Sequence, residues 1–205
     1  MRTGSLGAGA AGQARAQIQR TALALFIEKG YDKTSLREVA EELGVTKAAL
    51  YYHFPTKEDI VSSLVEERIA VVEELIGWAR RQPDRELMRR EFVRRYATGL
   101  LDADRHADIM RFFQRNQTIV DTLPAGQRMR EQLTRVFDLL AEPGEPLTRQ
   151  FRRAMALFAV HAGWLLPRGC DASEQERREA TLEVALQLIS DDDSGGGCAQ
   201  GRAPC

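Results

Sequence analysis

The sequence has few of the residues that cross-link a small protein or hold a metal ion. Its 205 residues include three cysteines and three histidines. Cys170 follows a glycine, Cys198 and Cys205 lie in a glycine-rich C-terminal segment, and no CxxC pair is present. An odd number of cysteines without metal-ligand spacing favours neither a disulfide framework nor a zinc site. We therefore expect no metal and no cofactor.

The sequence also lacks a hydrophobic run of the roughly 20 residues that a membrane-spanning helix needs. The first 12 residues are rich in glycine and alanine and lack the apolar core of a secretory signal. We expect a cytoplasmic protein without a membrane partner. The net charge of −1 shows no excess of either sign. It does not exclude DNA binding, because one locally basic surface is enough.

Strand patterns are missing as well, because no segment alternates apolar and polar residues for long. Apolar residues instead recur every three or four positions, with proline and glycine mostly between such runs. We predict an all-α fold with a disordered leader over 1–12 and a disordered tail over 191–205. The predicted helices cover about 13–29, 34–43, 46–53, 57–80, 83–101, 105–114, 121–141, 145–166 and 173–190.

Two of these helices are short and sharply delimited. Ser35 and Glu38 fit a capping box at the start of the first, although Thr34 could equally be the N-cap. Gly44 ends this helix, and Thr46 caps the next one. Two helices joined by such a tight turn form a helix-turn-helix unit, whose second helix lies in the major groove of DNA.

The composition of the second helix fits DNA reading. Its start offers Lys47 and the small Ala48, which lets the backbone approach DNA closely, and Leu50 is its one clear core anchor. The aromatic and imidazole groups that follow can donate to phosphates and pack on sugars and thymine methyls. A helix packed on another helix is the competing interpretation. The predicted DNA-contacting residues are Thr34, Ser35, Thr46, Lys47, Ala48, Tyr51, Tyr52, His53 and Lys57.

This stretch resembles the TetR family of bacterial regulators. The resemblance rests on Ala24-Leu25-Phe26, Gly30-Tyr31, the run from Thr34 to Ala40, and the run from Gly44 to Glu58. The rest of the chain matches only in helical character and length, which is usual for the variable C-terminal domain of this family. The resemblance implies a dimeric DNA-binding regulator with an N-terminal three-helix domain.

Specific roles follow from the resemblance. Family members contact DNA through the recognition-helix positions occupied here by Lys47, Ala48, Tyr51, Tyr52 and His53. The positions of Thr34 and Lys57 contact phosphates, while Leu50 and Phe54 belong to the core. Residue 48 is often glycine in the family, so alanine leaves the operator sequence open.

We divide the chain into a DNA-binding domain over 13–56 and a helical domain for effector binding and dimerisation over 57–190. Two subunits would read a palindromic operator with half-sites roughly 34 Å apart. Apolar stripes on the last two long helices would form a four-helix bundle between subunits, or they are core within one chain. The predicted interface residues are Phe151, Met155, Phe158, Ala162, Leu182, Ala185, Leu186 and Ile189.

The middle helices carry aromatic residues that could enclose an apolar or amphipathic effector. Each of them is individually more typical of core or surface than of a ligand contact. The candidate pocket residues are Trp78, Phe92, Tyr96, Met110, Arg111, Phe113, Asn116, His161 and Trp164. An effector would favour a state in which the reading helices no longer match successive grooves, with the helix over 57–80 as lever.

Two other sequence patterns give weak support for a ligand or metal site. The spacing Gly7-x-Gly9-x-x-Gly12 needs a βαβ unit to bind a dinucleotide, and none is predicted. The polar run Asp102, Asp104, His106 and Asp108 fits a helix junction better than a metal site.

No local catalytic motif is present, so we expect no enzyme. A repressor released by a small molecule is the favoured function. An activator, a regulator controlled by a protein partner, and a helical enzyme or binding protein are the alternatives.

Overall fold

The computed structural model describes residues 6–98, 103–162 and 172–190, and in these ranges it contains ten α-helices and no strand. The predicted all-α fold is confirmed. None of the described helices is long and apolar enough to cross a membrane. The helices are α1 (Leu6–Lys29), α2 (Leu36–Leu43), α3 (Lys47–His53), α4 (Lys57–Ala79), α5 (Arg85–Thr98), α6 (Ala103–Arg115), α7 (Gln117–Thr122), α8 (Pro124–Leu140), α9 (Leu147–His161) and α10 (Glu174–Ile189).

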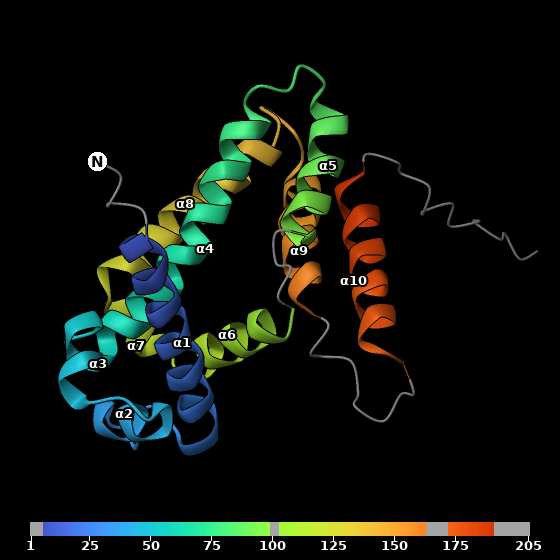
Figure 1. The fold of residues 1–205 in the computed structure, drawn as a ribbon. Helices are drawn as coiled ribbons and strands as arrows, with labels where there is room; N and C mark the ends of the chain where they lie inside the picture. Colours follow the sequence, from blue (N-terminus) through green and yellow to red (C-terminus); the bar gives the residue numbers. More distant parts are fainter. Residues whose placement is uncertain (1–5, 99–102, 163–171, 191–205) are drawn as a thin grey trace, which may run out of the picture.

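The helices form two groups that α4 connects. Helices α1, α2 and α3 gather around the first turns of α4, and α4 then runs to the opposite end of the molecule (Figure 1). Helix α8 packs along α4, while α5, α9 and α10 pack against one another. Helix α6 reaches back and packs against α1.

Each group has its own hydrophobic core. The first core joins α1, α2, α3 and the start of α4, and it includes Ile109 and Phe112 from α6. The ring of Phe112 lies 5.5 Å from that of Phe26 and 6.0 Å from that of Tyr31. The second core joins the end of α4 to α5, α8, α9 and α10. Both α4 and α6 therefore link the N-terminal helices to the rest of the chain.

The caps predicted around the short helices are present. Ser35, not Thr34, is the N-cap of α2 and forms a capping box with Glu38. Gly44 adopts the left-handed conformation, with a φ of 66°, and the side chain of Thr46 accepts a hydrogen bond from Ala49 N. Since these caps end α2 and start α3, they create the tight turn of a helix-turn-helix unit.

Two helix boundaries differ from the predictions. Helix α1 begins at Leu6, so the part of the predicted disordered leader from Leu6 onward is helical. The predicted helix over 121–141 begins at Pro124, the first position of α8, and the residues before it belong to α7, a short helix that was not predicted. Residues 1–5 and the predicted tail lie outside the described residues.

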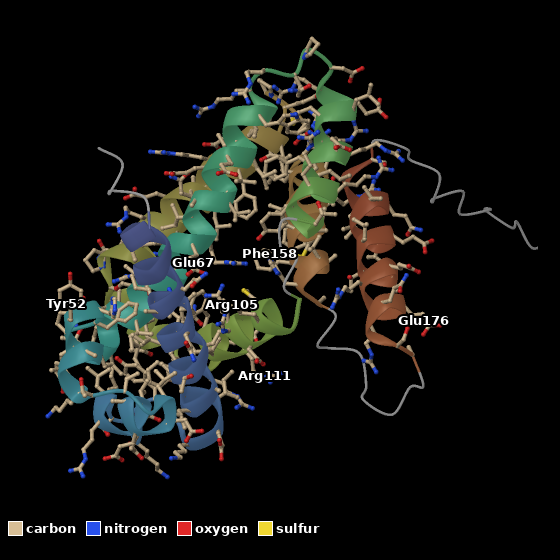
Figure 2. All side chains as sticks on the ribbon, in the orientation of Figure 1. Tyr52, Glu67, Arg105, Arg111, Phe158 and Glu176 are labelled. Atoms are coloured by element: carbon tan, nitrogen blue, oxygen red, sulfur yellow. The ribbon has the colours of Figure 1, made fainter. Side chains whose placement is uncertain are left out.

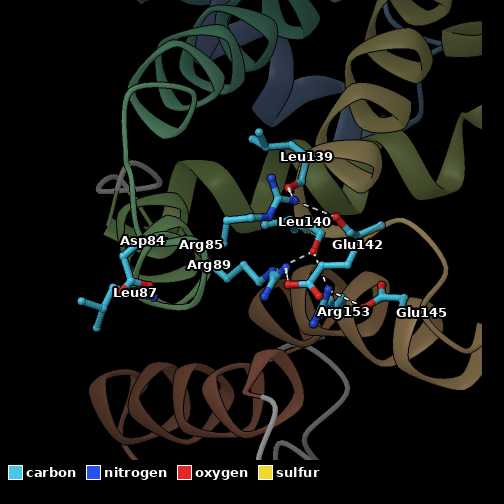
Figure 3. Close-up of polar contacts among 10 residues, drawn as sticks. Asp84, Arg85, Leu87, Arg89, Leu139, Leu140, Glu142, Glu145 and Arg153 are labelled. Carbon is cyan, nitrogen blue, oxygen red and sulfur yellow. Dashed lines mark hydrogen bonds and ion pairs between the residues drawn. The ribbon is translucent and has the colours of Figure 1, made fainter.

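Arginines bind the C-terminal carbonyls of α8 (Figure 3). Arg85 donates to Leu139 O at 3.1 Å and Ala141 O at 2.8 Å. Arg89 and Arg153 both donate to the carbonyl of Leu140 at 2.9 Å. These two guanidiniums are almost fully buried and are further paired with Glu142 and Glu145, respectively. A helix end buried without such donors would leave carbonyls unsatisfied, so the arginines join α5, α8 and α9 into one unit.

Candidate nucleic-acid interface

Helix α3 presents one face to solvent and one anchor to the core. Leu50 is fully buried, and Phe54, directly after the helix, is fully buried as well. Tyr51 is 39% exposed and Tyr52 is 84% exposed. Figure 2 shows Tyr52 projecting outward from the molecule. The aromatic run is therefore a surface feature of this chain and not a helix-packing face.

The other predicted contacts on α3 are also accessible. Thr46, Lys47 and Ala48 are exposed, and His53 is half-buried. The ammonium of Lys47 lies 5.2 Å from the ring centroid of Tyr51. Lysine and tyrosine thus share one surface, where a cation and amphipathic rings are available to phosphates and base edges.

Thr34 does not offer its hydroxyl to solvent. The residue is 1% exposed, and the hydroxyl donates to Gly30 O at 2.9 Å and lies 3.3 Å from Leu25 O. We correct the prediction of a phosphate contact by this side chain. Ser35 is exposed, and its hydrogen bonds, with a smaller effect of Lys29, lower the pKa of Glu38 below its ordinary value.

Lys57 lies against Tyr31. Its ammonium donates to Tyr31 O at 2.7 Å and sits 4.4 Å from the Tyr31 ring. The Tyr31 hydroxyl donates to Glu58 at 2.8 Å, and burial together with this carboxylate raises the pKa of Tyr31. An ammonium has three donors, so the phosphate contact predicted for Lys57 stays a prediction.

Arg15 of α1 contacts the end of α3 and was not predicted. Its guanidinium donates to His53 O at 2.8 Å and lies 4.1 Å from the ring of Phe54. An open cleft of about 630 Å³ beside this contact lies between α1 and α4. Arg15 is far from α3 in the sequence, and no local pattern connects the two.

A second missed feature is a polar node among α1, α4 and α6. Gln19 is 4% exposed, donates to the Ser63 hydroxyl at 2.9 Å and accepts from Arg105 at 3.3 Å. Arg105 also pairs with Glu67 at 2.9 Å, and Figure 2 shows these two side chains near each other. Hydrogen bonds of one buried glutamine therefore connect all three helices.

Part of the predicted effector pocket gathers in the second core. The Tyr96 hydroxyl lies 2.6 Å from His161 Nε2, and the rings of Phe92 and Tyr96 stack at 6.4 Å. Burial raises the pKa of Tyr96 to about 12 against an opposing effect of Arg68. Burial, with the same arginine acting in the same direction, lowers the pKa of His161 to about 4. The imidazole is therefore neutral at neutral pH.

The remaining pocket candidates do not join this group as one site. Trp78 packs against the second core beneath Arg95, whose guanidinium carbon is 4.2 Å from the ring. Trp164 lies outside the described residues. The other candidates lie in another part of the chain, on α6 and directly after it. Phe113 packs on the first core and Met110 is half-buried. Arg111 pairs with Asp108, and Asn116 donates to Phe112 O.

The predicted dimer interface divides between the two helices. On α9, Phe151 is 65% exposed and Phe158 is 57% exposed, while Met155 and Ala162 are half-buried. On α10, we correct this prediction for Ala185 and Ile189. There, Ala185 and Ile189 are buried within the chain and cannot form an interface, whereas Leu182 and Leu186 are half-buried and pack on the second core, so their place in an interface stays a prediction.

Two exposed apolar residues near this face were not predicted. Leu147 is 81% exposed on α9, in line with Phe151 one turn later, and Val184 is 48% exposed on α10. Leu147, Phe151 and Phe158 share one face because they recur at helical spacing.

A family model described as bacterial regulatory proteins of the tetR family matches residues 18–64. This segment contains the end of α1, the helix-turn-helix unit and the first turns of α4. Over these residues, the chain is similar to the TetR family.

Curated relatives match the same domain. The negative transcriptional regulator IcaR of the icaADBC biofilm operon from Staphylococcus epidermidis is 47% identical over 50 residues, or 24% of this chain and 27% of IcaR. The uncharacterised regulator YuxN of Bacillus subtilis is 46% identical over 48 residues, or 23% of this chain and 16% of YuxN. The chain thus matches little more than a quarter of IcaR and less of YuxN.

Solved structures of bacterial regulators match most of the chain. The fatty acid degradation regulator FadR from Bacillus halodurans superposes with a TM-score of 0.64 at 17% identity, covering 87% of this chain and 96% of FadR. The ketosteroid regulator KstR2 of Mycobacterium tuberculosis gives 0.61 at 13% identity, covering 86% and 93%. At these identities the likeness establishes the fold.

Proposed function

We propose that this protein is a DNA-binding transcriptional regulator that acts as a repressor. The observation that carries the proposal is the placement of α3. Its lysine and tyrosines are exposed to solvent on a capped helix, while Leu50 and the following Phe54 anchor it to the core. The printed description of IcaR as a negative regulator supports repression.

The protein would bind a palindromic operator as a homodimer. A single short recognition helix makes few base contacts, whereas two copies on a two-fold axis read two half-sites roughly 34 Å apart. The exposed phenylalanines on α9 supply a self-complementary apolar face of the kind that closes a dimer.

A small apolar or amphipathic molecule would release the operator. The group of Phe92, Tyr96 and His161 supports this part, because it combines aromatic surface with one polar pair inside the helical body. Helix α4 runs from α3 to this group and would transmit the change. The domains over 13–56 and 57–190 would then separate reading from sensing, in the cytoplasm.

The test is a genomic DNA selection with the purified full-length protein at stated salt, followed by affinity measurements on the enriched fragment. We expect a specific, salt-dependent affinity that Tyr52→Ala strongly weakens. Leu87→Ala, which truncates an exposed large side chain on α5 away from α3, is the matched control. Recovery of only non-specific binding would contradict the proposal.

A reporter gene behind the enriched fragment distinguishes repression from activation. Expression should rise when the gene for the protein is deleted. A fall in expression would favour the activator alternative, and no change would remove this fragment as a regulated promoter.

A further inference from the structure

We infer that Arg15 is a positioning residue for the recognition helix: it holds the C-terminal end of α3 on α1. The inference rests on the proposed function, since it concerns how α3 is presented to DNA. It adds a residue outside the helix-turn-helix unit to the reading machinery.

Two contacts from one guanidinium define this role. Arg15 Nη1 donates to His53 O at 2.8 Å, and Arg15 Cζ lies 4.1 Å from the centroid of the Phe54 ring. His53 is the last residue of α3 and Phe54 is its C-cap. One side chain therefore contacts both the last residue of the recognition helix and the buried ring of Phe54, its C-cap.

The chemistry suits the C-terminus of a helix. The last carbonyls of α3 have no partner within the helix, and the C-terminal end of a helix carries partial negative charge. A guanidinium satisfies one of these carbonyls, complements the charge and stacks on an aromatic face at the same time. Lysine would keep the charge but not the planar stacking.

Helix α3 needs such support because it is short. It has seven residues, and Leu50 is its one buried residue. Phe54, directly after the helix, adds a second apolar anchor, but neither apolar side chain can bond the carbonyl of His53. Arg15 adds a polar restraint at the C-terminal end, so the exposed face with Lys47 and Tyr51 keeps one orientation toward the groove.

The α1 residue one turn after Arg15 is tied to the body of the protein. Gln19 donates to Ser63 of α4 and accepts from Arg105 of α6. The same stretch of α1 thus contacts the end of α3 and two helices of the body. These contacts fix the part of α1 that carries Arg15 and so restrain the position of its guanidinium beside α3.

A phosphate contact is the competing role for an exposed arginine near a reading helix. The two roles differ in their salt dependence. Loss of one phosphate contact lowers the slope of log affinity against log salt by about 0.9 per contact. Loss of a positioning contact weakens specific binding at every salt concentration and leaves the slope unchanged.

The experiment compares the full-length wild type with Arg15→Ala, Arg15→Lys and Arg20→Ala on the genomic fragment that the wild type enriches. Arg20 is exposed on α1, so its substitution removes the same charge from the same helix. Affinity is measured across a salt series on this fragment and on a random duplex. Amide hydrogen exchange at Phe54, whose N–H bonds Leu50 O at 2.9 Å, is measured without DNA.

We expect Arg15→Ala to weaken specific binding about tenfold with an unchanged salt slope, as loss of a charged hydrogen bond allows. Exchange at Phe54 should accelerate in Arg15→Ala, remain slow in Arg20→Ala and be partly restored in Arg15→Lys. A reduced slope with unchanged exchange would overturn the inference in favour of a phosphate contact. Unchanged affinity and exchange would overturn it outright.

The hydrogen-exchange measurement keeps the two proposals separable. If the wild type enriches no DNA, the proposed function fails, while exchange at Phe54 still tests whether Arg15 holds the end of α3.

Discussion

The pair formed by Tyr96 and His161 shows how position alters a side chain. Both groups come from helices of the second core, and their polar atoms lie 2.6 Å apart. Burial favours the uncharged form of each, so the pKa of the tyrosine rises while that of the histidine falls. The protein thereby keeps a neutral hydrogen-bonding pair in an apolar setting.

This burial predicts a pH dependence of stability. Between its ordinary pKa of 6.5 and about 4, His161 is protonated in the unfolded chain but neutral in the folded protein. The free energy of unfolding should therefore decrease as pH falls through this window, by up to about 3 kcal/mol for this residue. Chemical denaturation of the wild type and His161→Gln between pH 7 and pH 4 measures it. Parallel curves for the two proteins would contradict the assignment.

Neighbouring residues on α3 should respond in opposite ways to truncation. Tyr52→Ala removes a side chain that is 84% exposed, so stability should change by less than about 0.5 kcal/mol while specific DNA binding weakens strongly. Leu50→Ala empties a fully buried position and should destabilise the protein by about 2–5 kcal/mol. Urea denaturation and DNA affinity of both variants test this. A strongly destabilised Tyr52→Ala would show that this ring packs inside the protein.

At the scale of elements, capping separates α2 from α3. The capping box of Ser35 and Glu38 satisfies N–H groups at the start of α2, and Gly44 turns the chain at its end. The left-handed φ of Gly44 is accessible to glycine at little cost, and its N–H bonds carbonyls of the last turn. The angle between the two helices therefore depends on a few backbone groups.

Gly44→Ala should lower the free energy of unfolding by about 1 kcal/mol, because alanine disfavours the left-handed conformation. A Cβ at this position would meet no atom within 4 Å, so the penalty comes from the backbone alone. Gly12→Ala is the control: it lies in α1 with equally open space and an ordinary helical backbone, and it should not destabilise. Thermal denaturation of both variants and the wild type measures the two changes in stability. Equal effects would contradict the role of the turn.

At the scale of the whole molecule, two cores share their connecting helices. The first core takes Ile109 and Phe112 from α6, and α4 contributes to both cores. The node of Gln19, Arg105 and Glu67 adds a polar connection among α1, α4 and α6. A displacement of α6 would therefore reach the helices that carry the reading surface.

The exposed face of α9 predicts the oligomeric state. Phe151→Glu combined with Phe158→Glu should convert a dimer into a monomer, because charges cannot be desolvated in an apolar interface. Operator affinity should fall with dimer loss. Leu87→Glu, at an apolar residue of α5 that is 65% exposed, is the matched control. Sedimentation measurements test this, and a monomeric wild type or a dimeric double variant would refute it.

The local features of the site follow from the sequence by itself. The capping box, the left-handed glycine and the exposed lysine and tyrosines of α3 depend on residues a few positions apart, and helical periodicity identifies Leu50 as the anchor. Such features obey short-range rules of hydrogen bonding and backbone conformation. The family resemblance also lies in this segment, so the helix-turn-helix prediction was confirmed there.

Only the tertiary structure decided which polar groups face inward. Thr34 looked available to DNA but bonds carbonyls inside the protein, and Arg153 lies buried beneath the end of α8. In the folded protein, Ala185 faces the second core and Arg15 lies at the end of α3. These outcomes depend on partners distant in sequence, and the charge or polarity of a residue does not reveal whether the fold supplies such a partner.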